Sequence, residues 1–144
     1  MVAGHASKVT SNDQIHLIHE HAHERQYVYP SLASPITLTG GAQWVLGAES
    51  ADLIAAAAIP RAFDVHHVVV SDPDTNADYE IAILGDGVEI GRVAFTRSNN
   101  FVNSIQIPIM CKIQPAGTAI TAKCADGTGG GGATVNVKVA IHMY

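Results

Sequence analysis

The chain has 144 residues, of which 47% are hydrophobic and only 15% are charged, and its formal net charge at pH 7 is −5 with histidine neutral. This length fits one domain whose core needs no disulfide or metal, and lysine and arginine form no cluster that would favour nucleic acid. No apolar run reaches the ~18 residues of a membrane span, and residues 1–14 lack the apolar core of a signal peptide, so we expect no membrane partner and synthesis in a cytoplasm.

The first predicted element is an arm, residues 12–25, that carries four of the eight histidines of the chain. A helix would place His16, His19 and His23 on one face. A strand would instead align His19, His21 and His23, so either geometry offers three imidazoles to zinc or nickel. The run from His19 to His23 also spells H-E-x-x-H, but no third ligand or cleft accompanies it. We therefore predict a docking arm without a metal, and the four histidines remain the alternative metal ligands.

From residue 36 onward apolar and polar residues alternate between closely spaced turn residues, which is typical of half-buried strands. Their short connections predict an all-β fold, an antiparallel two-sheet sandwich of the jelly-roll type. Residues 49–60 do not alternate, and they fit either a helix capped by Ser50 or an extended crossing between the sheets. We predict about eight strands, at residues 36–39, 43–48, 63–71, 79–84, 88–97, 104–113, 118–125 and 133–144.

The hairpin expected at residues 79–97 turns at Asp86-Gly87, a pair that favours a tight connection. Apolar side chains occupy both faces of this hairpin, and in a small sandwich the outer face then needs a cover. We expect a neighbouring subunit to supply it, in agreement with a charged fraction below the usual ~25%, although a sheet protein rich in Thr, Asn and Gly has the same composition. The expected subunit-interface residues are Tyr79, Ile81, Arg92 and Phe95.

The two cysteines, Cys111 and Cys124, fall in predicted strands on either side of residues 114–117. If these strands form a hairpin with Gln114 opposite Thr118, the cysteines are offset by three residues, or ~10 Å along a strand. That separation is too long for a disulfide, and a reducing compartment would also keep both thiols free.

Residues 72–78 resemble the start of a calcium loop, with an oxygen-bearing side chain at every second position. Ala77 stands where the sharp turn needs glycine and Ile83 stands where the bidentate glutamate belongs, so we predict a solvated turn. The glycine run at residues 129–132 leads into a strand without Gly-Lys-Ser, which excludes a P-loop and indicates a flexible loop tip.

Asp64 and His66 share one face of a predicted strand, and a sandwich can bring Cys111 and His142 close to that face. No nucleophile elbow and no third catalytic partner accompany these residues, so we predict that the chain is not an enzyme and uses no cofactor.

Several segments together resemble small structural proteins of tailed-bacteriophage virions, in particular the head decoration, or cement, proteins with a jelly-roll body. The resemblance rests on the order of these segments across residues 14–144 and not on a catalytic signature. The segments are residues 16–30, 35–48, 63–71, 89–97 and 107–144.

The resemblance implies a homotrimer that binds the major capsid protein at three-fold or quasi-three-fold positions and stabilises the head shell. It implies a place on the capsid surface of the virion after synthesis in the bacterial host cytoplasm. We expect an arm at residues 1–29 that touches the shell and a sandwich domain at residues 30–144. The expected docking residues are Ile15, His16, Leu17, Ile18, His19, His21, His23 and Arg25.

A jelly roll also suits a tail-tip module that binds a receptor or carbohydrate. Such a module usually exposes aromatic side chains in a groove. The single tryptophan, Trp44, falls in the strand expected at residues 43–48, which argues against this alternative.

Overall fold

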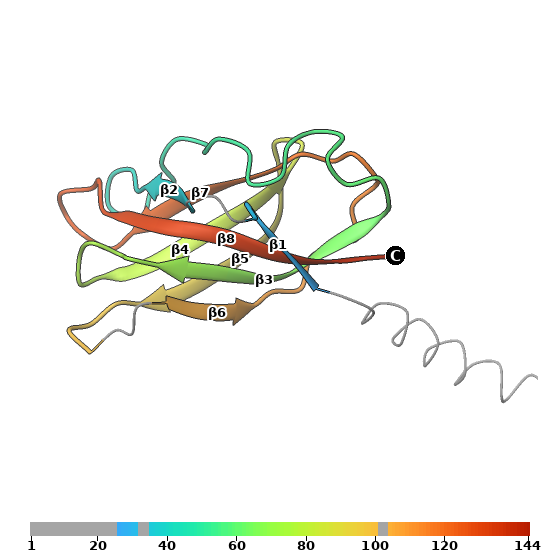
Figure 1. The fold of residues 1–144 in the computed structure, drawn as a ribbon. Helices are drawn as coiled ribbons and strands as arrows, with labels where there is room; N and C mark the ends of the chain where they lie inside the picture. The colour runs from blue at the N-terminus through green and yellow to red at the C-terminus, as the bar shows by residue number, and fades with distance from the viewer. Residues whose placement is uncertain (1–25, 32–34, 101–103) are drawn as a thin grey trace, which may run out of the picture.

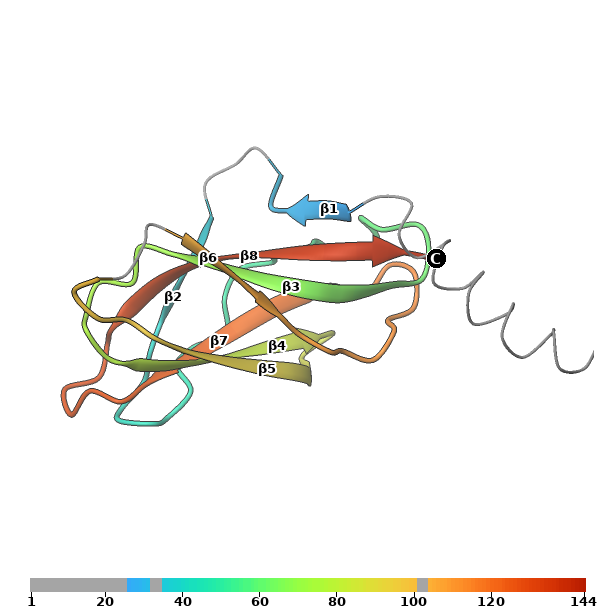
Figure 2. The same ribbon diagram turned by 90° about the horizontal axis from the view of Figure 1, so that it is seen from below.

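The computed structural model describes residues 26–31, 35–100 and 104–144, which form two antiparallel sheets packed face to face (Figures 1 and 2). The strands are β1 (Gln26–Tyr29), β2 (Ile36–Thr39), β3 (Phe63–Ser71), β4 (Asp78–Gly85), β5 (Val88–Thr96), β6 (Ser104–Pro108), β7 (Ile120–Asp126) and β8 (Thr134–Met143). The larger sheet has the order β1-β8-β3-β6, with β2 also paired to β8, and the smaller sheet has the order β5-β4-β7. In the described part of the chain, no helix is long and apolar enough to cross a membrane.

Most consecutive strands lie in opposite sheets. The chain crosses from one sheet to the other between β3 and β4, between β5 and β6, between β6 and β7, and between β7 and β8. This connectivity confirms the antiparallel sandwich of jelly-roll type. The core lies between the sheets because alternate residues of each strand point inward. In β8 the inward positions are fully buried, as the alternation predicts: Val135, Val137, Val139 and Ile141.

The β4–β5 hairpin has the predicted two-residue turn. Gly85 pairs with Val88, and the residues between them, Asp86 and Gly87, have φ angles of 47° and 80°. Two successive left-handed residues match the right-handed twist of the flanking strands, and an Asp-Gly pair adopts that geometry at little cost.

The hairpin expected between residues 104–113 and 118–125 is wrong. β6 pairs with β3 in the larger sheet, and β7 pairs with β4 in the smaller sheet, so the connection crosses from one sheet to the other. β6 ends at Pro108, which has no N–H to donate. The chain after it still bonds to β3 at two points, through the Ile109 N–H and through an isolated bridge between Gln114 and Phe63, before it crosses to the other sheet. Both cysteines are nevertheless free thiols, Cys124 in the core and Cys111 partly buried.

The strand expected at residues 43–48 is also wrong. Residues 41–54 instead follow the free edge of β7 as an irregular segment. Four backbone N–H groups of this segment donate hydrogen bonds to alternate carbonyls of β7. The four donors are Trp44, Gly47, Ser50 and Leu53. Donors spaced three residues apart cannot belong to a regular ladder, in which every second residue bonds. The segment covers the edge that β7 would otherwise expose.

The next stretch, residues 49–60, is the extended crossing and not the helix. Leu53, Ile54 and Ile59 are buried in the core, and Ile54 forms an isolated bridge with Ile120. The three large apolar residues of this stretch therefore face the gap between the sheets, whereas its alanines are exposed.

The sandwich begins earlier than the expected boundary at residue 30. β1, assigned to the arm by the sequence, pairs with β8 along its full length from Gln26 to Tyr29. Residues 1–25 of the arm lie outside the described residues.

Three of the four expected subunit-interface residues prove to be core residues of the single chain. Tyr79 and Ile81 are fully buried, and the Phe95 ring is stacked on Tyr79 with 4.9 Å between the ring centroids. They point toward the opposite sheet, so no neighbouring subunit is needed to cover them. Only Arg92 is exposed, and it forms ion pairs with Glu80 and Glu89 at 2.8 Å.

Candidate functional site

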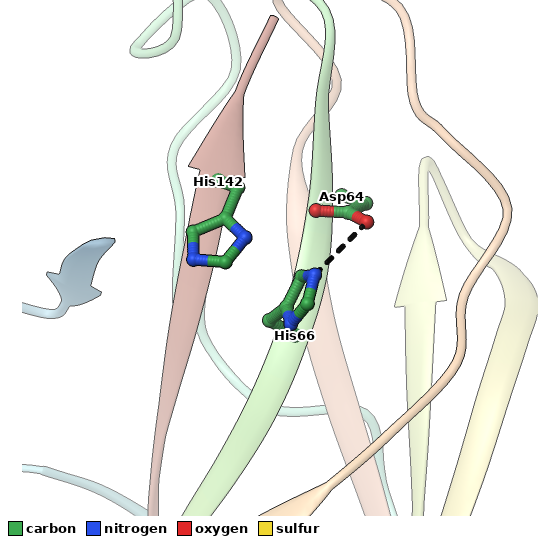
Figure 3. Close-up of side chains that lie close together, drawn as sticks. All are labelled: Asp64, His66 and His142. Atoms are coloured by element: carbon green, nitrogen blue, oxygen red, sulfur yellow. Dashed lines mark ion pairs between the residues drawn. The ribbon is translucent and has the colours of Figure 1, made fainter. Parts of the chain in front are cut away.

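Three metal-ligand side chains gather on the outer face of the larger sheet, where β3 begins and β8 ends (Figure 3). Asp64 and His66 come from β3 and His142 comes from β8, and each offers one ligand atom within 4.8 Å of the others. The antiparallel register places Asp64 directly opposite His142. We call these three residues the Asp-His-His cluster.

A β-bulge in β3 positions the second member of the cluster. The register shifts between Val65 and His67, so that His66 is the extra residue and its carbonyl accepts a hydrogen bond from the Ile109 N–H at 3.0 Å. Without the shift, His67 would point into the core and Val68 would point out. The bulge therefore explains how two consecutive histidines both stay outside the core of a strand that buries Val65 and Val68 on either side.

The contacts within the cluster are polar and close. His66 Nε2 lies 3.6 Å from Asp64 Oδ2, an ion pair when the imidazole is protonated, and the centroids of the His66 and His142 rings are 3.9 Å apart. The Tyr144 hydroxyl donates a hydrogen bond of 3.0 Å to Asp64 Oδ2. Burial, and then this carboxylate, raise the pKa of Tyr144 to about 12, so its hydroxyl stays a donor at neutral pH.

The cluster does not include the thiol that the sequence brought into consideration as a nucleophile, that of Cys111. Burial, with a smaller effect of Asp64, raises the pKa of this thiol to about 11, which keeps it protonated and unreactive at neutral pH. The sequence did point to this region through Asp64, His66 and His142, but it could not establish that all three converge.

A second feature is a hollow beside Trp44, which is lined by the start of β4 and the end of β5. Figure 1 shows that these ends of β4 and β5 lie away from the C terminus. Trp44 is 52% exposed, has a φ of 58°, and lies so close to Gly127 that a Cβ there would come within 2.8 Å of the indole. The hollow has a volume of about 330 Å³, and carboxylates stand beside the indole in it. Its lining is Trp44, Asp78, Tyr79, Glu80, Ala94, Phe95 and Thr96.

A third feature, the hairpin-tip hollow, lies where the β4–β5 turn meets the connection from β6 to β7. Its volume is about 390 Å³, and its lining is Gly85, Val88, Glu89, Ile90, Lys112, Ile113, Gln114 and Pro115. Val88 is 67% exposed and Ile113 is 51% exposed, and Met110, farther along the same connection, is 98% exposed. Figures 1 and 2 place this end of the sandwich on the same side as the C terminus and the start of β1.

The residues that resembled a calcium loop do not converge on one point. Asp74 accepts hydrogen bonds from the Thr134 N–H and the Thr75 hydroxyl, and these bonds outweigh burial and lower its pKa. Asp78 instead accepts one from the Thr96 hydroxyl. These separate partners agree with the predicted turn. The arm residues expected to dock or bind metal lie outside the described residues: Ile15, His16, Leu17, Ile18, His19, His21, His23 and Arg25.

No protein-family model and no curated protein sequence matches the chain. Solved structures are similar in fold. A family 35 carbohydrate-binding module from an environmental isolate is 11% identical with a TM-score of 0.46, over 82% of this chain and 97% of that one. The insecticidal delta-endotoxin Cry8Ea1 of Bacillus thuringiensis is 10% identical with a TM-score of 0.48, over 76% of this chain but only 19% of the toxin. The VP2 subviral particle of infectious bursal disease virus is 16% identical with a TM-score of 0.40, over 84% of this chain and 33% of VP2.

Proposed function

We propose that the chain is a non-enzymatic structural protein of a tailed-bacteriophage virion, a homotrimeric decoration protein that binds the major capsid protein and stabilises the head shell. The sequence resemblance to decoration proteins supports this proposal, and the jelly-roll sandwich is compatible with it. The structural observation that carries it is the hairpin-tip hollow, an apolar surface left uncovered in a single chain.

The composition of the hollow suits contact between copies of the chain. Val88, Ile90 and Ile113 supply apolar surface, and the lining also contains two residues of opposite charge, Lys112 and Glu89, the second of which is paired with Arg92. An interface between subunits also combines apolar and charged residues. In this proposal the hollow is the subunit contact in place of the buried residues Tyr79, Ile81 and Phe95. The β4–β5 hairpin still contributes to the contact, through the residues at its turn.

The same end of the sandwich also carries the start of β1, into which residues 1–25 lead. We assign capsid attachment to residues 1–25. Three arms on one trimer would bind a shell far more tightly than one, because the second and third attachments are intramolecular.

Sedimentation of the full chain at micromolar concentration tests the self-association. We expect three chains per particle, and we expect the double substitution Val88→Asp with Ile113→Asp to give monomers by placing carboxylates in an apolar contact. Val45→Asp is the matched control, because Val45 is also half exposed but lies at the other end, next to Trp44. A monomeric wild-type chain would contradict the trimer, and a trimer that survives the double substitution would remove the hollow from the interface.

Binding to heads that lack the decoration protein tests the capsid partner. We expect the full chain to co-sediment with such heads, and a chain without residues 1–25 to remain folded and trimeric but to bind poorly. Unchanged binding by the truncated chain would move the capsid contact to the sandwich, and absence of binding by the full chain would contradict the proposed partner.

A second candidate function, a virion module that binds carbohydrate, is favoured by one specific observation. Trp44 does not lie inside a strand but stands half exposed over a hollow, together with Asp78 and Glu80. An apolar ring face beside carboxylates can stack on a sugar ring and accept hydrogen bonds from its hydroxyl groups.

The fluorescence of Trp44 reports directly on this alternative, since the chain has one tryptophan. Titration with soluble bacterial surface polysaccharides should change the emission if sugars stack on the indole. A Trp44→Phe variant with weakened binding, and an Asp52→Asn control with unchanged binding, would support the module. A flat titration across capsular, teichoic and lipopolysaccharide-derived glycans would argue against it.

A further inference from the structure

We propose that the Asp-His-His cluster binds one divalent transition-metal ion of the zinc class, through a carboxylate oxygen of Asp64 and one imidazole nitrogen each from His66 and His142. Its ligands are residues of the sandwich and not the four histidines of the arm. It would join the start of β3 to the end of β8.

The geometry is close to that of a bound ion. In a tetrahedral zinc site with bonds of roughly 2.0 to 2.2 Å, neighbouring ligand atoms lie about 3.3 to 3.5 Å apart. His66 Nε2 lies 3.6 Å from Oδ2, one of the two oxygens of the Asp64 carboxylate, and one ligand atom from each of the three residues lies within 4.8 Å of the other two. Rotation of the carboxylate would present Oδ1, the other oxygen, at the same position. Small side-chain rotations are therefore sufficient, and the pairing of β3 with β8 already holds the backbone in place.

The hydrogen bonding of Asp64 leaves a ligand position. Oδ2 accepts the hydrogen bond of the Tyr144 hydroxyl, whereas Oδ1 is buried and has no hydrogen-bond partner. A buried carboxylate oxygen without a partner is costly, and a cation is one of the few groups that would compensate for it. Tyr144 would act as a support for the ligand, because an outer hydrogen bond fixes the orientation of a metal-binding carboxylate.

The ligand types narrow the choice of ion. Two imidazoles and one carboxylate suit zinc, nickel, copper or iron, whereas calcium and magnesium prefer sites made of oxygen ligands. The half-buried position fits an ion that enters from solvent, since Asp64 and His66 expose 15% and 35% of their side chains. Three protein ligands leave one position of a tetrahedral ion open to water or to a group from another chain.

The test uses the full chain, stripped of metal by a chelator and titrated with zinc chloride in a calorimeter. Because the arm could bind zinc by itself, the titration is repeated in a background in which His16, His19, His21 and His23 are all replaced by glutamine. We expect this background to bind one zinc ion per chain. Saturation at about a hundred times the dissociation constant should raise its melting temperature by roughly 5 to 10 °C, while calcium should have little effect.

Three substitutions in that background locate the ion. Asp64→Asn and His66→Gln should each weaken zinc binding at least tenfold and abolish the thermal shift. His67→Gln is the matched control and should change neither, because His67 is adjacent in the strand but outside the cluster. Melting of the metal-free variants shows whether they fold, and in the chain with its own arm, His66→Gln should lower the zinc stoichiometry by one.

Each other outcome would overturn the assignment. An arm-substituted chain that binds no zinc would assign all metal binding to the arm. Equal losses in His66→Gln and His67→Gln would indicate weak binding to surface histidines in general. Zinc binding that survives both Asp64→Asn and His66→Gln would remove the cluster from the site.

Discussion

Replacement of Tyr79 tests whether the aromatic residues of the β4–β5 hairpin are buried within the core of a single chain or in a contact with a neighbouring subunit. Tyr79 is fully buried and is stacked on Phe95. Its hydroxyl donates a hydrogen bond of 2.8 Å to the Thr75 carbonyl and accepts one of 3.3 Å from the Thr75 N–H. It therefore holds the turn before β4 as well as the core.

The magnitude follows from these two roles. Removal of a large buried ring creates a cavity, and Tyr79→Ala should lower the free energy of unfolding by about 3 to 5 kcal/mol. Tyr79→Phe keeps the ring and the stacking but leaves the backbone groups of Thr75 without their partner, so a loss of about 1 to 3 kcal/mol is expected. Val45→Ala, at a half-exposed position, should change the value by less than about 0.5 kcal/mol.

Urea unfolding followed by circular dichroism, at two protein concentrations that differ tenfold, measures these losses. We expect each loss to be the same at both concentrations, and we expect both variants to keep the subunit number of the wild-type chain. A loss below about 1 kcal/mol for Tyr79→Ala would refute the core assignment. A loss that grows as the protein is concentrated would instead assign Tyr79 to a subunit interface, because a contact between chains contributes more stability as association becomes more complete.

Three further predictions follow from the packing and the titrating groups. Gly47→Ala should cost about 1 to 3 kcal/mol in urea unfolding, because a Cβ would lie 2.0 Å from the Thr39 carbonyl oxygen, whereas Gly129→Ala, with open space around it, should be neutral. Burial raises the pKa of Cys124 to about 12, so this thiol should react with Ellman's reagent at pH 8 only after unfolding, and a fast reaction in the folded chain would contradict the burial. Desolvation and then the adjacent His66 imidazole lower the pKa of His67 below about 6.5, so the unfolded state takes up this proton more readily than the folded state. The folded chain should therefore lose stability as the pH falls through about 6.5. His67→Asn should reduce the slope of melting temperature against pH in that range.

The amino-acid sequence by itself determined the class of fold and the inward residues of most strands. Alternation in β8 and the Asp-Gly turn after β4 are local signals, because side-chain direction in a strand and φ angles in a turn depend on neighbouring residues. The bulge in β3 was not predicted, because it follows from the burial of both Val65 and Val68, which the structure shows.

Apart from the β4–β5 hairpin, tertiary structure alone decided which strands pair and which side chains meet. β6 and β7 are close in sequence but lie in different sheets, because any two strand edges offer the same backbone hydrogen bonds and the choice depends on burial of the whole chain. Trp44 is exposed because residues 41–54 follow the edge of β7 as an irregular segment and not as a strand. The Asp-His-His cluster exists only because β3 and β8, from distant parts of the sequence, are adjacent strands whose register brings Asp64 opposite His142.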